Sequence, residues 1–338
     1  MLLQHNANLQ PFNTFGIAAT ADRLGRFHTV HELRALLALP EMQGAPVLIL
    51  GGGSNVLFTR NFHGTVLLNA IPGIAVVRED ADHVWVKAGA GVTWHTFVLH
   101  CVEHGWGGVE NLSLIPGKVG AAPMQNIGAY GVEIKDTFAT LEALRIADGE
   151  VVTFDRDACA FGYRESFFKR AGRDRYVILN VTFRLNKKAV LNTSYGNIQQ
   201  ELERMGITQP TLRDVSDAVI AIRRSKLPDP AVLGNAGSFF KNPVVPQELA
   251  DRIRVEHPDL VSFPAGAGLA KLAAGWLIER AGLKGHSFGT HGVHDKQALV
   301  LVNRGGATGK ALYDLSEHVL RTVKEKFGVE LEREVNIL

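Results

Sequence analysis

Residues 115–131 read IPGKVGAAPMQNIGAYG and contain four glycines, three alanines and two prolines beside a single charge, Lys118. Side chains this small cannot build a core helix, and Ser, Glu and Lys are too scarce for a disordered linker. The glycines allow positive φ and close approach of backbone N–H groups, while Gln125 and Asn126 add directional donors and acceptors. The stretch predicts either a loop against a large ligand or an irregular loop packed on its own domain.

A second glycine-rich segment favours ligand binding. Residues 46–58 read PVLILGGGSNVLF. The apolar run 47–50 is typical of a buried strand, and the three glycines after it predict a turn that Ser54 and Asn55 brace through side-chain hydrogen bonds. Such a turn can hold a diphosphate through backbone N–H groups. A Rossmann fingerprint would need Gly in place of Val56, and a Walker loop would need Gly-Lys-Ser/Thr, so a dinucleotide here requires another fold.

The composition is that of a globular protein with two or three domains: 338 residues, 46% hydrophobic and 21% charged. A formal charge of +2 without Lys/Arg runs gives no electrostatic case for nucleic acid. No signal peptide or membrane-spanning stretch is apparent, so we expect a cytoplasmic protein. Cys101 and Cys159 lack metal-ligand spacing, and Cys101 lies on the apolar stripe of a predicted helix.

Hydrophobic periodicity predicts the main elements. The alternation at 177–185 indicates a strand with one buried face, and 139–154 indicates a hairpin around Asp148-Gly149. Lys226-Leu227-Pro228-Asp229-Pro230 ends a helix and marks a domain boundary. Further strands are expected at 64–69, 83–89, 298–303 and 329–338, and helices at 93–104, 270–281 and along Leu312, Leu315, Val319, Val323 and Phe327.

Two motifs could supply catalytic groups. In FGYRESFFK (161–169), Arg164 is either a structural cation stacked on aromatic rings or a fork for a carboxylate or a developing enolate. In GNAGSFFKNP (234–243), Ser238 is either a turn serine or a proton donor shielded by the Phe-Phe pair. Glu332 and Glu334 share one strand face, and spacing alone does not single out either. We interpret His294 as a surface loop histidine rather than a base.

Together these segments resemble the UDP-N-acetylenolpyruvoylglucosamine reductase family. The matching stretches run in the family's order across nearly the whole chain: NTFGI (13–17), LILGGGSNVLF (48–58), GVENLSLIPGKVGAAPMQNIGAYGVEI (108–134), FGYRESFFK, RRSKLPDP (223–230), GNAGSFFKNP, KLAAGWLIERAGLKG (271–285) and LEREV (331–335). LNTSYGNI (191–198) is similar to the tyrosine loop of the type I subgroup. The sequence departs from the pattern at Arg333, where relatives often have proline, and it continues for only four residues after Glu334.

The resemblance implies an α+β protein with a two-domain FAD-binding fold of the vanillyl-alcohol-oxidase type and a third, α/β substrate-binding domain. The implied boundaries are 1–70, 71–227 and 228–327, with 328–338 returning to one of the first two domains. The implied catalytic residues are Arg164, Ser238 and Glu334. Substrate binding is implied for Tyr163, Tyr195, Arg223, Lys226, Asn242 and Gln297. FAD binding is implied for Leu50, Gly51, Gly52, Gly53, Ser54, Asn55, Val56, Leu57, Pro116, Gly117, Gly120, Ala121, Gln125, Asn126, Gly128, Ala129, Tyr130, Gly131 and Ile178, and no metal is implied.

The implied activity is reduction of the enolpyruvyl group of UDP-N-acetylglucosamine enolpyruvate, with tightly bound FAD and with NADPH as the hydride donor, in peptidoglycan precursor synthesis and hence in cell wall biogenesis, cell shape and division. We expect a monomer that binds neither membrane nor nucleic acid. Two alternatives remain open: an alcohol or hydroxy-acid oxidase of the same FAD fold, and a nucleotide-sugar binding module without catalysis.

Overall fold

The computed structural model describes residues 3–338, and contacts between residues divide the chain into two compact units. The large unit holds residues 3–7, 21–52 and 63–225. The C-terminal unit holds 8–20, 53–62 and 226–338. The chain passes from one unit to the other five times, after Ala7, Thr20, Gly52, Phe62 and Ser225. The predicted division into three domains stays a prediction.

The first sheet of the large unit has the strand order β1 (Gln4–Asn8), β2 (Thr20–Phe27), β5 (Phe62–Asn69), β3 (Val47–Leu50). β3 runs parallel to β5 and confirms the strand predicted before the glycine turn. Helix α1 (Val30–Leu37) begins where the Thr29 hydroxyl accepts a hydrogen bond from the Glu32 N–H, an ordinary N-cap. Its buried face, Leu33 and Leu36, packs on core residues that include Phe27 and Leu67.

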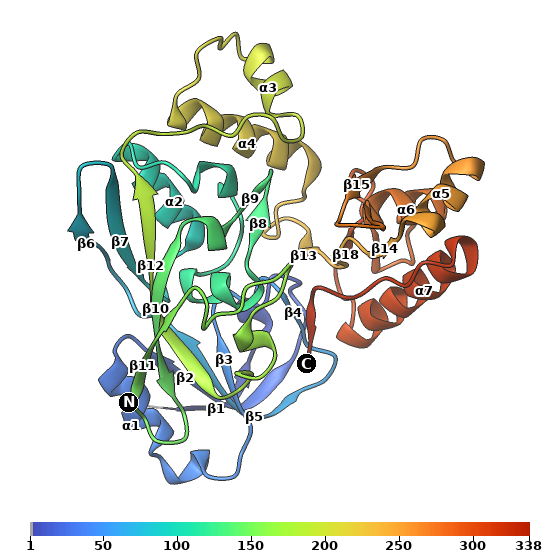
Figure 1. Cartoon of the computed structure of the whole chain (residues 1–338). Coiled ribbons are helices and arrows are strands. Elements are labelled where there is room, and N and C mark those ends of the chain that lie inside the picture. Colours follow the sequence, from blue (N-terminus) through green and yellow to red (C-terminus); the bar gives the residue numbers. More distant parts are fainter. Residues whose placement is uncertain (1–2) are drawn as a thin grey trace. The chain divides into compact units, whose positions relative to one another are not determined.

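The second sheet of the large unit has five strands, all antiparallel to their neighbours, in the order β11 (Val151–Asp155), β10 (Phe138–Arg145), β12 (Tyr176–Asn186), β7 (His83–Gly89), β6 (Ile74–Glu79) (Figure 1). Helix α2 (Trp94–Glu103) packs its apolar stripe on this sheet, and Cys101 lies in that stripe, fully buried as predicted. The rings of Trp94, Phe97 and Phe183 meet at centroid distances of 4.8 to 5.7 Å.

The expectation of one buried face for the strand at 177–185 is wrong at Ile178 and Thr182. Ile178 and Thr182 are buried as well as their neighbours Val177 and Val181. β12 is the central strand, so both of its faces are covered: Val177 and Leu179 pack toward α1, whereas Ile178 packs in the core that contains α2. Strict alternation is expected only where one face meets water, and tertiary packing overrides that pattern here.

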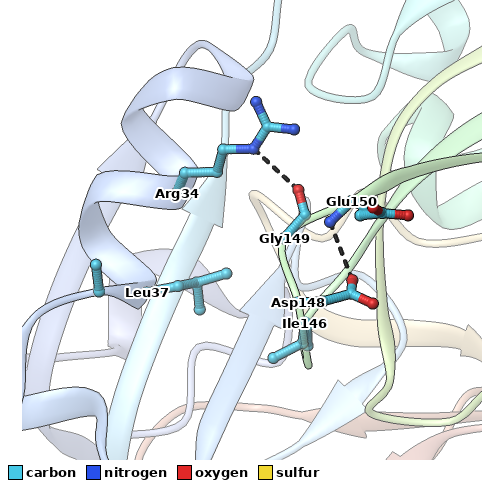
Figure 2. Close-up of a pocket in the computed structure, with 7 residues that line it drawn as sticks. Arg34, Leu37, Ile146, Asp148, Gly149 and Glu150 are labelled. Atoms are coloured by element: carbon cyan, nitrogen blue, oxygen red, sulfur yellow. Dashed lines mark hydrogen bonds between the residues drawn. The ribbon is translucent and has the colours of Figure 1, made fainter.

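The hairpin predicted around Asp148-Gly149 joins β10 to β11. Gly149 has φ of 71°, a left-handed value that suits glycine. Arg34 of α1 reaches the turn, where its Nε donates to the Gly149 carbonyl at 2.9 Å (Figure 2). The turn therefore links the helix of the first sheet to the edge of the second.

A smaller helical layer completes the large unit. Helix α4 (Leu212–Lys226) places Val215 and Val219 against α3 (Ile198–Arg204), and it ends at Lys226, where the Lys226–Pro230 segment predicted a helix end. Residues 119–125 form a 3-10 helix. It ends at Asn126, whose φ of 45° is left-handed. A short hairpin, β8 (Gly128–Ala129) and β9 (Val132–Glu133), follows it.

The C-terminal unit contains two three-stranded sheets, one two-stranded sheet and three α-helices. One three-stranded sheet has the order β13 (Gly234–Ser238), β18 (Val300–Asn303), β17 (His291–Val293), and the other β14 (Val244–Pro246), β16 (Leu269–Leu272), β15 (Ser262–Pro264). The helices are α5 (Gln247–Glu256), α6 (Ala274–Arg280) and α7 (Gly309–Phe327). The helix expected at 270–281 begins only at Ala274, because residues 269–272 pair with strands on both sides. Strand pairing outweighs the helix propensity of alanine there.

Two N-terminal segments belong to this unit. The Thr14 carbonyl accepts from the Asn235 N–H at 3.0 Å, and the Phe15 carbonyl accepts from Asn303 Nδ2 at 2.8 Å. β4 (Val56–Leu57) runs parallel to β19 (Asn336–Ile337) near the C-terminus. The single strand expected at 329–338 is thus a two-residue strand preceded by an isolated bridge between Phe240 and Arg333. Across residues 3–338, no helix combines the length and apolarity that a membrane span requires.

Truncating Phe183 should show how much the aromatic core contributes to the free energy of unfolding. Phe183 is fully buried, so Phe183→Ala should lower the free energy of unfolding by about 3–5 kcal/mol through lost burial and a residual cavity. Urea unfolding measures the change. Val77→Ala is the control, since Val77 is 53% exposed and lies on β6, the edge strand of the same sheet. Equal losses in the two variants would contradict this description of the core.

Candidate active site

In the large unit, Gly51 and Gly52 of the first glycine-rich segment lie beside Gly117 and Lys118 of the second. A Cβ added to Gly52 would stand 3.1 Å from the Gly117 Cα, and one added to Gly51 would meet the Lys118 side chain at 3.5 Å. The Gly117 carbonyl also accepts a hydrogen bond from the first residue of α2, Trp94, at 3.0 Å. The structure therefore brings two backbones into contact with no side chain between them, which is the arrangement that a cradle of N–H groups needs.

Arg164 is tied to the end of the second glycine-rich segment. Its Nη2 donates to the Gly128 carbonyl at 2.6 Å, and its Nη1 lies 3.5 Å from the Asn126 carbonyl and 3.9 Å from a Glu133 carboxylate oxygen. Its guanidinium also lies 5.3 Å from the centre of the Tyr163 ring. Arg164 has φ of 53°, a strained value for a residue with a side chain. Several contacts thus fix the direction of this guanidinium.

Asn126, expected among the cofactor ligands, uses its side chain inside the protein. Its Nδ2 donates to Glu133 Oε2 and to the Gly162 carbonyl, both at 3.0 Å, and its Oδ1 accepts from the Lys135 N–H at 3.2 Å. The side chain is fully buried. Asn126 therefore holds the glycine-rich loop to the segment that carries Arg164.

Sequence reasoning missed Asn111, which links two loops of the candidate site. Its Nδ2 donates to the Tyr130 carbonyl at 3.0 Å and to the Asn192 carbonyl at 2.8 Å. It is 1% exposed, beside Glu110, whose pKa burial raises. The exposed Tyr195 follows Asn192 and lies against Gly131, since a Cβ there would be 3.1 Å from the Tyr195 Cβ. Glu110, Asn111 and Ser113 lie among apolar residues in the sequence, and this was the available signal, because buried polar groups need partners.

Arg223, expected to contact substrate, is a partly buried cation. Its Nε is buried and has no hydrogen-bond partner among residues 3–338. Burial lowers the pKa of its guanidinium, and the nearby Tyr130 acts in the opposite direction. A buried donor without a partner is costly, so an anionic group of a ligand would satisfy it.

In the C-terminal unit the structure brings Ser238 and Glu334 onto neighbouring segments. Ser238 ends β13, after Gly237 with φ of 68°, and is followed by Phe239 and Phe240, at most 1% exposed. The Glu334 N–H donates to the Phe239 carbonyl at 2.8 Å. The Glu334 carbonyl accepts from Asn55 Nδ2 at 3.2 Å, so the residue after the glycine turn holds the tail.

The other predicted substrate residues of this unit lie apart in the chain. Asn242 accepts a hydrogen bond from the first residue of α6, Ala274, at 2.9 Å, and Gln297 Oε1 accepts from the Leu299 N–H at 3.4 Å. Lys226 is exposed at the boundary between the units. The interpretation of His294 as a surface group is wrong: it is 8% exposed, because it follows β17 and its N–H bonds the Val300 carbonyl.

A surface pocket elsewhere in the large unit is separate from these residues. It lies between α1 and the β10–β11 turn and is lined by Arg34, Leu37, Ala38, Ile146, Asp148, Gly149 and Glu150 (Figure 2). Hydrogen bonds from Arg34 Nε and from the Glu150 N–H are made within its wall. None of the predicted site residues lines it, so it is not the candidate active site.

Two family models match separate parts of the chain. Residues 22–155 match the family model of an FAD binding domain, and residues 229–338 match that of the C-terminal domain of UDP-N-acetylenolpyruvoylglucosamine reductase. The crystal structure of UDP-N-acetylenolpyruvylglucosamine reductase (MurB) from Thermus caldophilus has a TM-score of 0.67 at 24% identity, covering 100% of this chain and 99% of that one. The fold is therefore the predicted α+β FAD-binding fold with a further C-terminal domain, that of a flavoprotein.

Curated relatives define the family. The UDP-N-acetylenolpyruvoylglucosamine reductase of Chromobacterium violaceum is 54% identical and covers 100% of both chains. That of Pseudomonas aeruginosa is 53% identical over 99% of this chain and 98% of its own. The chain belongs to the UDP-N-acetylenolpyruvoylglucosamine reductase family, as its motifs predicted.

Gly52→Ala should weaken flavin retention. At 3.1 Å from the Gly117 Cα, the added methyl group is closer than ordinary contact distance and would push the two loops apart. We expect a lower ratio of flavin absorbance to protein absorbance after gel filtration than in wild type. Val77→Ala is the control, because Val77 is 53% exposed on β6 and belongs to neither glycine-rich segment. Full flavin content in Gly52→Ala would contradict the cradle.

Proposed function

We infer that the chain is a flavin-dependent oxidoreductase that uses NADPH to reduce UDP-N-acetylglucosamine enolpyruvate to UDP-N-acetylmuramate in peptidoglycan precursor synthesis. Full-length identity of 54% to a relative of that name carries this inference. The oxidase and binding-module alternatives are not favoured by any observation. We place the enzyme in the cytoplasm and expect it to act as a monomer, without membrane or nucleic-acid partners.

The residues present fit FAD. A dinucleotide needs backbone donors that it can approach closely, and the contact between Gly52 and Gly117 supplies two such backbones. We assign residues 50–57, selected positions of 116–131 and Ile178 to cofactor binding. When bound, FAD supplies the hydride chemistry, and the protein orients and polarises the substrate.

Arg164 is proposed to hold the substrate carboxylate. Adding hydride to the methylene carbon of an enolpyruvyl group moves charge onto the adjacent carbon and its carboxylate. A guanidinium whose direction is already fixed by the Gly128 carbonyl and the Tyr163 ring stabilises that charge without reorganising. We place Tyr163, Tyr195, Arg223, Lys226, Asn242 and Gln297 at the nucleotide sugar.

Ser238 is proposed to donate a proton to the substrate, and Glu334 is proposed to donate a hydrogen bond to it. Ser238 gives its hydroxyl proton to the carbanionic carbon, and the buried Phe239 and Phe240 beside it help to exclude water. Glu334, in its protonated form, is proposed to donate to the enolate-like carboxylate of the substrate. Its backbone is held at both the N–H and the carbonyl, which fixes the start of the side chain.

Stopped-flow mixing tests the activity. Protein reduced with NADPH and then mixed with UDP-N-acetylglucosamine enolpyruvate should regain oxidised-flavin absorbance within the mixing experiment, with UDP-N-acetylmuramate as the product. Oxygen alone should restore it much more slowly. Peroxide formed from an alcohol, with no response to the enolpyruvyl substrate, would instead identify an oxidase.

Ser238→Ala should separate the two half-reactions, which are reduction of the flavin by NADPH and reduction of the enolpyruvyl substrate. NADPH oxidation by an artificial acceptor should persist, whereas enolpyruvyl reduction should fall by about 10²–10⁴-fold, the range for loss of one positioned acid. Ser287→Ala, on an exposed loop, is the control and should retain both. Wild-type enolpyruvyl turnover in Ser238→Ala would remove Ser238 from the mechanism.

A further inference from the structure

The tail that carries Glu334 is attached to the rest of the C-terminal unit at every residue from Glu332 to Glu334. The Glu332 carbonyl accepts from the Lys241 N–H, and the Glu334 N–H donates to the Phe239 carbonyl, both at 2.8 Å. Arg333 lies between them, opposite Phe240 in an antiparallel bridge. Since side chains alternate along an extended segment, Arg333 points away from the face of Glu334.

The Arg333 side chain lies on helix α7. Its Nε donates to Ser316 Oγ at 2.8 Å, and its Nη2 donates to Glu317 Oε1 at 2.6 Å. Its guanidinium carbon is 4.7 Å from the centre of the Tyr313 ring. Tyr313, Ser316 and Glu317 occupy positions i, i+3 and i+4, one face of the helix. We call these three residues and Arg333 the tail clamp.

The partners of the tail clamp are themselves fixed. Ser316 is fully buried, and its hydroxyl donates to the Tyr313 carbonyl at 2.6 Å, so its oxygen is left to accept from Arg333. Tyr313 and Arg333 both hydrogen-bond the Glu317 carboxylate and lower its pKa, so it stays ionised. Only an arginine offers a planar fork that can stack on a ring while donating from two nitrogens.

We propose that Arg333 is a positioning residue for Glu334. The tail clamp attaches the backbone immediately before Glu334 to a 19-residue helix and so fixes the direction in which the Glu334 carboxyl leaves the chain. On the other face of the tail, Lys241 Nζ contacts Glu332 Oε1 at 2.5 Å. The inference rests on the proposed catalytic role of Glu334 and assigns Arg333 no contact with substrate.

Arg333→Gln tests the inference through the separate half-reactions. The variant loses the charge and the stacking fork, so kcat for enolpyruvyl reduction should fall by about 10–100-fold, the scale of a misplacement near 1 Å. Flavin reduction by NADPH should be unchanged. Arg333→Lys should recover only part of the loss. Glu330→Gln is the matched control, because it breaks an exposed ion pair between α7 and the tail, Lys324 with Glu330 at 2.6 Å, away from Glu334.

A double-mutant cycle distinguishes positioning from general destabilisation. In a Glu334→Gln background, Arg333→Gln should change kcat by less than about twofold, because residues that act through one another are not additive. Additive losses, or wild-type enolpyruvyl turnover in Arg333→Gln, would overturn the inference. Full activity in Glu334→Gln alone would instead overturn the role of Glu334. Should Arg333→Gln fail to fold, Glu317→Gln carries the same test with the Tyr313 stacking kept.

Discussion

The close approach of two glycine backbones, at Gly52 and Gly117, is the constraint on which the large unit's candidate site depends. A Cβ added to Gly52 would stand 3.1 Å from the Gly117 Cα, so the turn after β3 leaves no ordinary room for a side chain at this position. The second loop is also held from behind, by α2 through the Gly117 carbonyl. A rigid backbone surface results, and such a surface can bind polar oxygens without a reorganisation cost.

Hydrogen bonds connect the second glycine-rich loop to the charged side chain of Arg164. Asn126 joins the glycine-rich loop to the segment before Arg164, and Arg164 returns two contacts to the carbonyls of the loop. The left-handed backbone of Arg164 is strained, and the surrounding hydrogen bonds maintain it. In the C-terminal unit, two hydrogen bonds hold the backbone of Glu334: its N–H donates to the Phe239 carbonyl, and its carbonyl accepts from Asn55 Nδ2.

Sequence patterns predicted the elements with strong local signals and the family. The strand before the glycine turn, the hairpin at Asp148-Gly149 and the stripe of α2 are each determined by neighbouring residues. The patterns misplaced the start of α6 and the exposure of one face of β12, because both depend on partners distant in sequence. Asn111 escaped notice for the same reason, since its two acceptors lie 19 and 81 residues away. The roles of Arg164, Ser238 and Glu334 came from motif resemblance and stay predictions.

Asn111 has a consequence for motion. One buried amide group donates to the backbone of the glycine-rich loop at Tyr130 and to the backbone of the tyrosine loop at Asn192. Each loop thus gives one carbonyl to the same buried amide, and local opening of either loop leaves an Asn111 N–H without its acceptor. We therefore expect a molecule that orders the glycine-rich loop to slow hydrogen exchange around Tyr195 as well, because both loops are held by this one amide.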